Sequence, residues 1–213
     1  MPRSKTAKKT IQKILDISLK LFNTHGFANV KIQDIIDKLA TFGLSKGAIY
    51  HHFNNKDDIL EAILAQYEQE SKAIWEIQHS SHNGRDKIKA IIMQYVEHYF
   101  KHRELMRDSY MFFSSSRVLA HRLKHNHICP ILESLIEEGN ADGSLNVAYP
   151  KAASEMLFWA VYVWIHYSFY PLNQNDYIHK VRHIRMMCEG VGLSVIDEEV
   201  SATLLKLWQE MMR

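Results

Sequence analysis

The sequence predicts an all-α protein, and three observations carry this prediction. The 213 residues include only 8 glycines and 4 prolines, too few for the tight turns of a many-stranded sandwich or barrel. Apolar residues recur at steps of three and four along most of the chain, which is the period of helices with one buried face. A hydrophobic content of 46% supplies a core and excludes a disordered chain. We expect a three-helix domain over residues 1–56, joined by a long helix to a helical domain over residues 57–213.

The N-terminal part is predicted to form three helices, over residues 6–24, 32–39 and 45–53. Gly26 suits a left-handed cap at the end of the first helix, and Phe27 can fold back onto that end. Lys31 stands where a Ser or Thr would cap the second helix. Ser45 is a good N-cap for the third helix, and we expect Phe53 at its end to face inward.

The rest of the chain is also predicted to be helical. A fourth helix starts at Lys56 and runs toward residue 78. Turn-rich residues at 114–116 and 140–144 separate later elements, and Gly139 is expected to end one of the helices. The later helices are predicted over residues 85–102, 128–138, 150–170, 177–192 and 197–213.

The segment at residues 152–170 is apolar on nearly all sides. Its length approaches that of a membrane span, but Glu155 and His166 lie within it and its flanks are not loaded with lysine. We therefore expect no membrane contact. Such a helix must be covered on more than one side, either by a second subunit or by its own core in a monomer. Two cysteines provide no disulfide framework, and no apolar run follows the basic N-terminus, so a cytoplasmic protein is expected.

Charge is distributed unevenly along the chain. Residues 1–56 hold ten Lys or Arg against three acids, a net charge of +7, so the remainder carries −5 within an overall charge of +2. A cationic domain of this kind attracts a polyanion such as DNA. Charge alone is equally typical of a solvated helix face, so a motif has to decide between the two.

A helix-turn-helix pattern lies at residues 32–56. Two short helices follow each other across a tight connector, which lets the second helix enter a DNA major groove. The second helix opens with Ser45, Lys46 and Gly47, where N–H groups, a cation and a slim first turn suit the approach to phosphates. Lys56 is expected to clamp a phosphate from the flank. The residues predicted to contact DNA are Lys31, Ser45, Lys46, Gly47, Ala48, Tyr50, His51 and Lys56.

The two segments ILDISLKLFNTHGFANVKIQDIIDKL and GLSKGAIYHHFNNKDDIL resemble the N-terminal domain of the TetR family of bacterial repressors. The shared pattern is an apolar helix ending in Leu-Phe, a following Gly, an Asp-Ile pair, the motif G-(V/L)-S-x-G-x-(L/I)-Y-x-(H/Y)-F, and an acidic, Leu-bearing helix start. Here it is formed by Leu21, Phe22, Gly26, Asp34, Ile35, Gly43, Leu44, Ser45, Gly47, Ile49, Tyr50, His52, Phe53 and Lys56.

Two departures from the family pattern stand out. Residues 40–42 look like a three-residue insertion before Gly43, which either extends the preceding helix or bulges outward and leaves Phe42 against Phe53 or exposed. Lys31 replaces the usual Ser or Thr, which loses a cap worth about 1 kcal/mol but places a cation near the DNA backbone.

The resemblance implies a homodimer formed by the last long helices. It also implies a small molecule that binds in the C-terminal domain and changes the spacing of the two DNA-binding heads. The paired surfaces are expected on residues 152–170 and 177–192. The interface residues predicted on them are Met156, Trp159, Val163, Tyr167, Val181, Ile184 and Cys188.

The C-terminal domain has more aromatic and Met side chains than packing of a core requires. They predict an adaptable pocket for an apolar or cationic aromatic effector, although packing in the core is the alternative for each of them. The residues assigned to this pocket are Tyr95, Tyr99, Met106, Tyr110, Phe113, Trp159 and Tyr162.

Metal and enzyme chemistry find little support in the sequence. Histidines pair at i, i+4 in His98/His102 and His179/His183 and crowd residues 121–129, but no carboxylate-His-His signature accompanies them, so no metal site is assigned. The phosphate-binding glycine motifs and HExxH are missing, so we expect no catalysis and no cofactor.

The function predicted from these observations is a ligand-responsive transcriptional repressor. It would bind a pseudo-palindromic double-stranded operator as a homodimer and be released by a small molecule. The alternative is a helical small-molecule-binding or protein-interaction module whose basic front only keeps it soluble.

Overall fold

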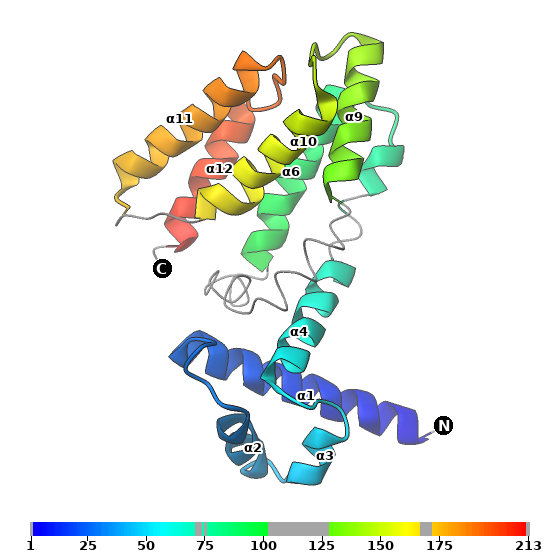
Figure 1. Cartoon of the computed structure of the whole chain (residues 1–213), viewed down its shortest axis with the longest axis vertical. Coiled ribbons are helices and arrows are strands. Elements are labelled where there is room, and N and C mark those ends of the chain that lie inside the picture. Colours follow the sequence, from blue (N-terminus) through cyan, green and yellow to red (C-terminus); the bar gives the residue numbers. More distant parts are fainter. Residues whose placement is uncertain (1, 71–73, 75, 102–127, 167–171, 212–213) are drawn as a thin grey trace. The chain divides into compact units, whose positions relative to one another are not determined.

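The computed structural model describes residues 2–70, 74, 76–101, 128–166 and 172–211, and every regular element within these ranges is helical (Figure 1). This confirms the predicted all-α class. No helix in these ranges is long and apolar enough to cross a membrane. The helices are α1 (Pro2–His25), α2 (Ile32–Ala40), α3 (Lys46–Tyr50), α4 (Lys56–Glu70), η1 (Glu76–His79), α6 (Gly84–Lys101), α9 (Ile128–Asp142), α10 (Pro150–Phe158), η3 (Trp159–Val163), η4 (Trp164–His166), α11 (Gln174–Gly190) and α12 (Glu198–Met211).

The described residues up to Glu70 form one compact unit, in which α1 packs against α2 and α4. The helix α4 is part of this unit because its apolar side chains complete the core, so the unit extends beyond the predicted boundary at residue 56. The buried core consists of Ile14, Leu15, Phe22, Phe27, Val30, Ile35, Ile36, Leu39, Ile49, Phe53, Ile59, Leu60, Ile63, Leu64 and Tyr67.

The end of α1 is closed as predicted. Gly26 has φ +78°, and its N–H donates to the carbonyl of Phe22 at 2.8 Å. This is a left-handed cap, which a glycine adopts without the steric cost of a Cβ. The ring of Phe27 then lies edge-on to that of Phe22, with the ring centroids 5.0 Å apart.

The remaining described residues form a second unit, with α6 between α9 and α12. In addition, α10 packs on α9, and α11 packs on α12 (Figure 1). The two sides of α6 are tied by charge as well as by apolar contact. The buried Lys87 pairs with Glu138 of α9 at 2.6 Å, while Arg85 and Lys89 pair with Asp197 just before α12.

The helix α9 runs through Gly139 to Asp142, so the predicted helix end at Gly139 is wrong. Gly139 lies where the first residue of α6 meets α9: a Cβ on Gly84 would lie 2.3 Å from the backbone nitrogen of Gly139. Here the absence of a Cβ permits close packing of two backbones and does not end the helix. The helix ends at Asp142, and Gly143, which follows it, has φ +80°.

The predicted helix over residues 150–170 begins at Pro150 as expected but is not uniform. Its α-helical part ends at Phe158, a π-helical turn covers Trp159–Val163, and a 3-10 turn covers Trp164–His166. The π turn accommodates one additional residue and so changes which side chains follow the α10 face. Residues 167–170 of this prediction lie outside the described residues, as does the predicted break at 114–116.

The helix α4 is described up to Glu70, and residues 71–73 and 75 of the helix predicted toward residue 78 lie outside the described residues. One other boundary differs from the predictions. The helix α11 begins at Gln174, three residues early, because Asn173 caps it: its side-chain oxygen accepts from the N–H of Asp176 at 3.0 Å.

Candidate nucleic-acid interface

The additional residues between α2 and α3 close α2 with a Schellman motif. The N–H of Leu44 donates to the carbonyl of Leu39 at 3.2 Å, and the N–H of Gly43 donates to that of Ala40 at 2.9 Å. Gly43 has φ +79°, the left-handed conformation that this motif requires. The insertion therefore adds a capped turn to the end of α2 and leaves Phe42 exposed on it, at 50% of its full surface.

The helix α3 is anchored from within and free on its outer side. Ser45 accepts a hydrogen bond from the N–H of Ala48 at 3.2 Å, which confirms the predicted N-cap. Ile49 is fully buried, and Phe53 is buried just after the helix. The regular helix ends at Tyr50, not Phe53, although the N–H of Phe53 still bonds to the carbonyl of Ile49.

The outer side of α3 carries several side chains predicted to contact DNA. Lys46, Gly47, Tyr50 and His51 are exposed, and Ala48 is partly so. The Lys46 ammonium lies 5.8 Å from the centre of the Tyr50 ring, so the cation and the aromatic ring share one surface. Gly47 has open space where a Cβ would stand, apart from the Ser45 hydroxyl at 4.0 Å.

Lys31 is exposed at the start of α2 and provides no side-chain cap, as its residue type predicts. The carboxylate of Asp34 accepts from the N–H of Lys31 at 2.7 Å instead, so one free backbone donor of the helix start is satisfied. The ammonium of Lys31 stays available at the surface.

Lys56 differs from the other predicted cations because its ammonium is used within the unit. It donates to the carbonyls of Phe27 at 2.6 Å, Ala28 at 3.3 Å and Val30 at 2.8 Å. It also lies 4.4 Å from the centre of the Phe27 ring. An ammonium has three donors, and carbonyls take up all of them. We therefore remove Lys56 from the set of expected phosphate contacts.

In the second unit, the structure brings together part of the predicted effector pocket. The rings of Tyr95 and Tyr162 have centroids 4.3 Å apart, and Phe158, which was not assigned to the pocket, stacks on Tyr162 at 5.6 Å. Tyr99 is buried one turn along α6, and burial raises the pKa of its hydroxyl to about 12. Trp159 is 46% exposed, and its ring lies edge-on to that of Phe158, with the ring centroids 5.8 Å apart. Met106, Tyr110 and Phe113 lie outside the described residues.

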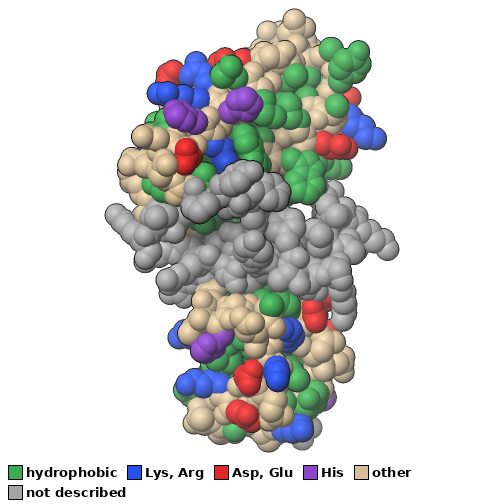
Figure 2. Space-filling view, turned by 60° about the vertical axis from the view of Figure 1, so that its left-hand side comes forward, with side chains coloured by type: hydrophobic (Ala, Val, Ile, Leu, Met, Phe, Trp, Pro, Cys, Tyr) green, Lys and Arg blue, Asp and Glu red, His purple; other side chains and the backbone are tan. Residues whose placement is uncertain are grey.

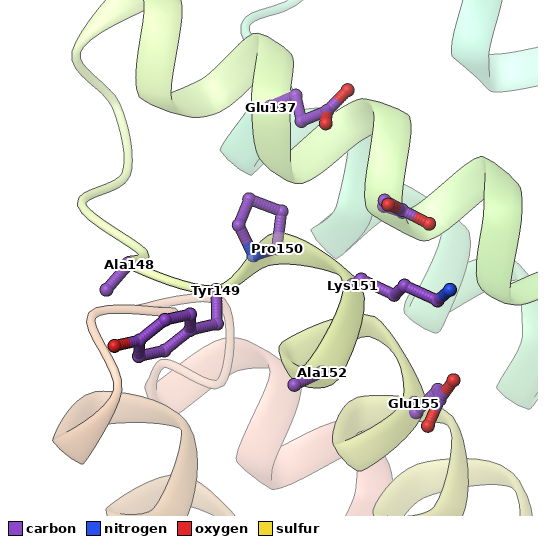
Figure 3. A pocket seen from close by; sticks show the side chains of 8 residues that line it. Glu137, Ala148, Tyr149, Pro150, Lys151, Ala152 and Glu155 are labelled. Atoms are coloured by element: carbon purple, nitrogen blue, oxygen red, sulfur yellow. The ribbon is translucent and has the colours of Figure 1, made fainter.

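A hollow of about 490 Å³ opens elsewhere on the second unit, between α9 and the start of α10 (Figure 3). None of the predicted effector residues lines it. Figure 3 shows Glu137 on α9 facing the segment that carries Pro150 and Lys151. The residues that line this hollow are Glu133, Glu137, Ala148, Tyr149, Pro150, Lys151, Ala152 and Glu155.

Three of the predicted dimer residues are wrong because the subunit buries them in its own core. Val181, Ile184 and Cys188 form the stripe of α11 that lies inside the unit, each at most 2% exposed. The same burial raises the pKa of the Cys188 thiol to about 12. Trp159 is exposed, Met156 and Val163 are half-buried, and Tyr167 lies outside the described residues.

The exposed sides of α10 to α11 carry a different set of residues. Trp159, Trp164 and Met186 are the large apolar side chains there, and the ring of His183 lies 6.2 Å from that of Trp164. Figure 2 shows one face of the second unit on which hydrophobic and histidine side chains lie close together. The interface predicted from the sequence did not include Trp164 or Met186, because periodicity does not tell which of two apolar stripes a subunit buries in its own core.

Within the described ranges, no three His, Cys, Asp or Glu side chains gather as a metal site would require. His98 is buried on α6, while His179 and His183 are exposed on α11. The histidines at positions 102, 121, 125 and 127 lie outside these ranges.

Residues 14–63 match the family model described as bacterial regulatory proteins, tetR family. A curated relative, the uncharacterized HTH-type transcriptional regulator TtgW of Pseudomonas putida, is 39% identical over 59 residues. That match covers 28% of this chain and 42% of TtgW, so it spans less than half of the relative's length.

Solved structures match over most of the chain. A transcriptional regulator of the TetR/AcrR family from Thermobifida fusca has a TM-score of 0.60 at 21% identity, covering 92% of this chain and 96% of that one. SmeT, solved as a complex with triclosan, has a TM-score of 0.61 at 20% identity, covering 93% and 91%. At this identity the likeness concerns the fold, and that fold is an all-helical one with the helix-turn-helix at its N-terminus.

Proposed function

Through residues 14–63 this chain belongs to the TetR family of bacterial regulatory proteins, and we propose that it is a repressor released from its operator by a small molecule. It acts as a homodimer on a pseudo-palindromic double-stranded site. Each subunit places α3 in a major groove, and a twofold axis places the two copies of α3 on successive half-sites.

The outward side of α3 is the observation that carries this proposal. Ile49 and Phe53 hold the helix from below, while Lys46, Tyr50 and His51 stay exposed above them. Anchoring on one side and exposure on the other is what a helix needs in order to reach base edges while its position stays determined. We assign base or phosphate contacts to Lys46, Tyr50 and His51, with further contacts from Lys31, Ser45, Gly47 and Ala48.

The dimer is proposed to form through the exposed sides of α10 to α11. Trp159, Trp164 and Met186 offer large apolar surfaces there, which a second copy would cover. An isologous contact of this kind also determines the distance between the two DNA-binding units.

The effector is proposed to be an apolar or aromatic molecule that binds beside the cluster of Tyr95, Phe158 and Tyr162. The structural relative SmeT, solved with triclosan, supports a small-molecule role for this fold. Release requires the effector to bind one subunit arrangement more tightly than the other, and that difference in affinity limits the response.

Selection from a random pool of DNA duplexes with the purified chain tests the proposal. We expect enrichment of a pseudo-palindrome, with a logarithm of affinity that falls linearly with the logarithm of salt concentration. The Lys46→Ala variant is expected to make that slope shallower by about one. A selection that enriches no sequence contradicts the proposal and favours a module without specific DNA binding.

A further inference from the structure

The inserted turn after α2 brings a cation of α1 to the edge of the helix-turn-helix. Lys13, in the middle of α1, has its ammonium 4.7 Å from the centre of the Phe42 ring. Phe42 lies only three residues before Ser45, the cap of α3, and both Lys13 and Phe42 are exposed. Residues far apart in sequence thus form one cation–aromatic pair beside the start of α3.

The geometry keeps the Lys13 ammonium available to an anion. One face of the ammonium meets the ring, which cannot accept all three N–H groups, so donors stay directed to solvent. Two acids of α1 and α2 accept hydrogen bonds from glutamines of their own helix: Asp16 from Gln12 at 2.9 Å, and Asp37 from Gln33 at 2.6 Å. Among the described residues, no ion pair includes Lys13.

The position of the pair suits a backbone phosphate better than a base. A major groove that holds α3 is bordered on each side by phosphates, and residues that precede the cap of such a helix lie at that border. Lys46 over Tyr50 is a second exposed pair of the same kind, on α3 itself. Two cations, each held over an exposed ring, would then lie on the DNA-facing side of one unit.

We propose that Lys13 binds a DNA backbone phosphate and that Phe42 is the positioning residue that holds it there. This inference rests on the proposed function. The three-residue insertion thereby adds a contact from α1 to the interface. Residues 40–42 carry the aromatic ring next to that lysine, and the Schellman motif with Gly43 closes the turn that holds the ring.

Salt dependence of DNA affinity tests the inference with the full chain. Affinities are measured against the duplex selected from the random pool and against a random-sequence duplex, because phosphate contacts persist in both. Lys13→Gln is expected to make the salt slope shallower by about one on both duplexes. Lys13→Arg is expected to keep the slope, because a guanidinium also lies well on an aromatic face. The matched control Lys151→Gln removes an exposed lysine of the second unit and is expected to leave the slope unchanged.

Phe42 is tested through its coupling to Lys13. Phe42→Leu keeps apolar bulk but removes the aromatic face, so we expect a loss of affinity that is smaller than that of Lys13→Gln. In the Lys13→Gln background the same change is expected to have no further effect. Thermal unfolding of each variant verifies that the half-exposed position 42 leaves the fold intact.

The outcomes separate this inference from the proposed function. If Lys13→Gln shows the same salt slope as the Lys151→Gln control, the inference is overturned. Specific binding by the wild-type chain would still support the proposed function. Independent effects of Phe42→Leu and Lys13→Gln overturn the positioning role of Phe42. If the random pool yields no site, the proposed function fails, and the random-sequence duplex still decides whether Lys13 meets a phosphate.

Discussion

Predictions for single residues were reliable where the interaction partner lies within a few positions in the sequence. Ser45 caps α3 and Gly26 closes α1, because each needs only its own neighbouring backbone. Lys56 was predicted wrongly as a phosphate clamp because its partners, the carbonyls after α1, lie 26 to 29 residues away in the sequence. A lysine at a helix start looks the same in a sequence whether its charge faces DNA or a carbonyl.

We predict that Lys56→Met lowers the free energy of unfolding by about 1–3 kcal/mol, because charge-assisted hydrogen bonds to buried or half-buried carbonyls are lost. DNA affinity should fall as well, but the salt slope should not change, since Lys56 meets no phosphate. Urea unfolding and salt titration measure the two effects. Lys46→Met is the matched control: it should make the salt slope shallower and leave the free energy of unfolding unchanged. A shallower slope in Lys56→Met with unchanged stability would show a phosphate contact after all.

At the scale of elements, glycine was the residue most easily misread. Gly139 looked like a helix end, yet it lies inside α9, where Gly84 of α6 approaches its backbone. Gly43 was placed in a connector and indeed adopts the left-handed conformation, which closes the lengthened α2. The sequence shows where a glycine stands. Only the packing shows whether that glycine permits a left-handed turn or a close contact between two backbones.

The contact between α6 and α9 leads to a prediction about Gly84→Ala. Its Cβ would lie 2.4 Å from the carbonyl oxygen of Leu135, as well as close to the backbone of Gly139, so the two helices must separate. We expect the free energy of unfolding to fall by about 1–3 kcal/mol, the usual cost of overpacking. Gly190→Ala serves as control, because its Cβ meets nothing within 4 Å, and should be neutral or stabilising by up to about 1 kcal/mol. Equal Tm values for both variants would refute this account of the contact.

For the molecule as a whole, the described residues divide into a unit that holds the helix-turn-helix and α4, and a second unit built around α6. The apolar content of α10 to α11 was expected to serve a second subunit. Part of it serves the subunit's own core instead, through Val181, Ile184 and Cys188. The large apolar side chains that stay exposed there are Trp159, Trp164 and Met186.

A double substitution, Trp159→Glu with Met186→Glu, is predicted to convert the dimer to monomers, because each adds a charge to the surface proposed to be covered. Light scattering after size exclusion measures the mass. Operator affinity should fall about 100-fold or more, since the two half-sites are then bound independently. Tyr149→Glu alters an aromatic residue that is more exposed, at 78%, and lies outside this surface, so it should leave the dimer intact. A dimer that survives the double substitution places the interface elsewhere.

The sequence by itself determined the helical class, the family through residues 14–63, the caps of α1 and α3, and the inward side of Phe53. These features depend on period, on local hydrogen bonds and on residue order, all of which the chain carries along its length. Tertiary structure alone decided the partners of Lys56, the role of Gly139, the pairing of Lys13 with Phe42 and the buried stripe of α11. Each of these depends on which distant segment lies opposite, and a pattern of residue types does not specify that neighbour.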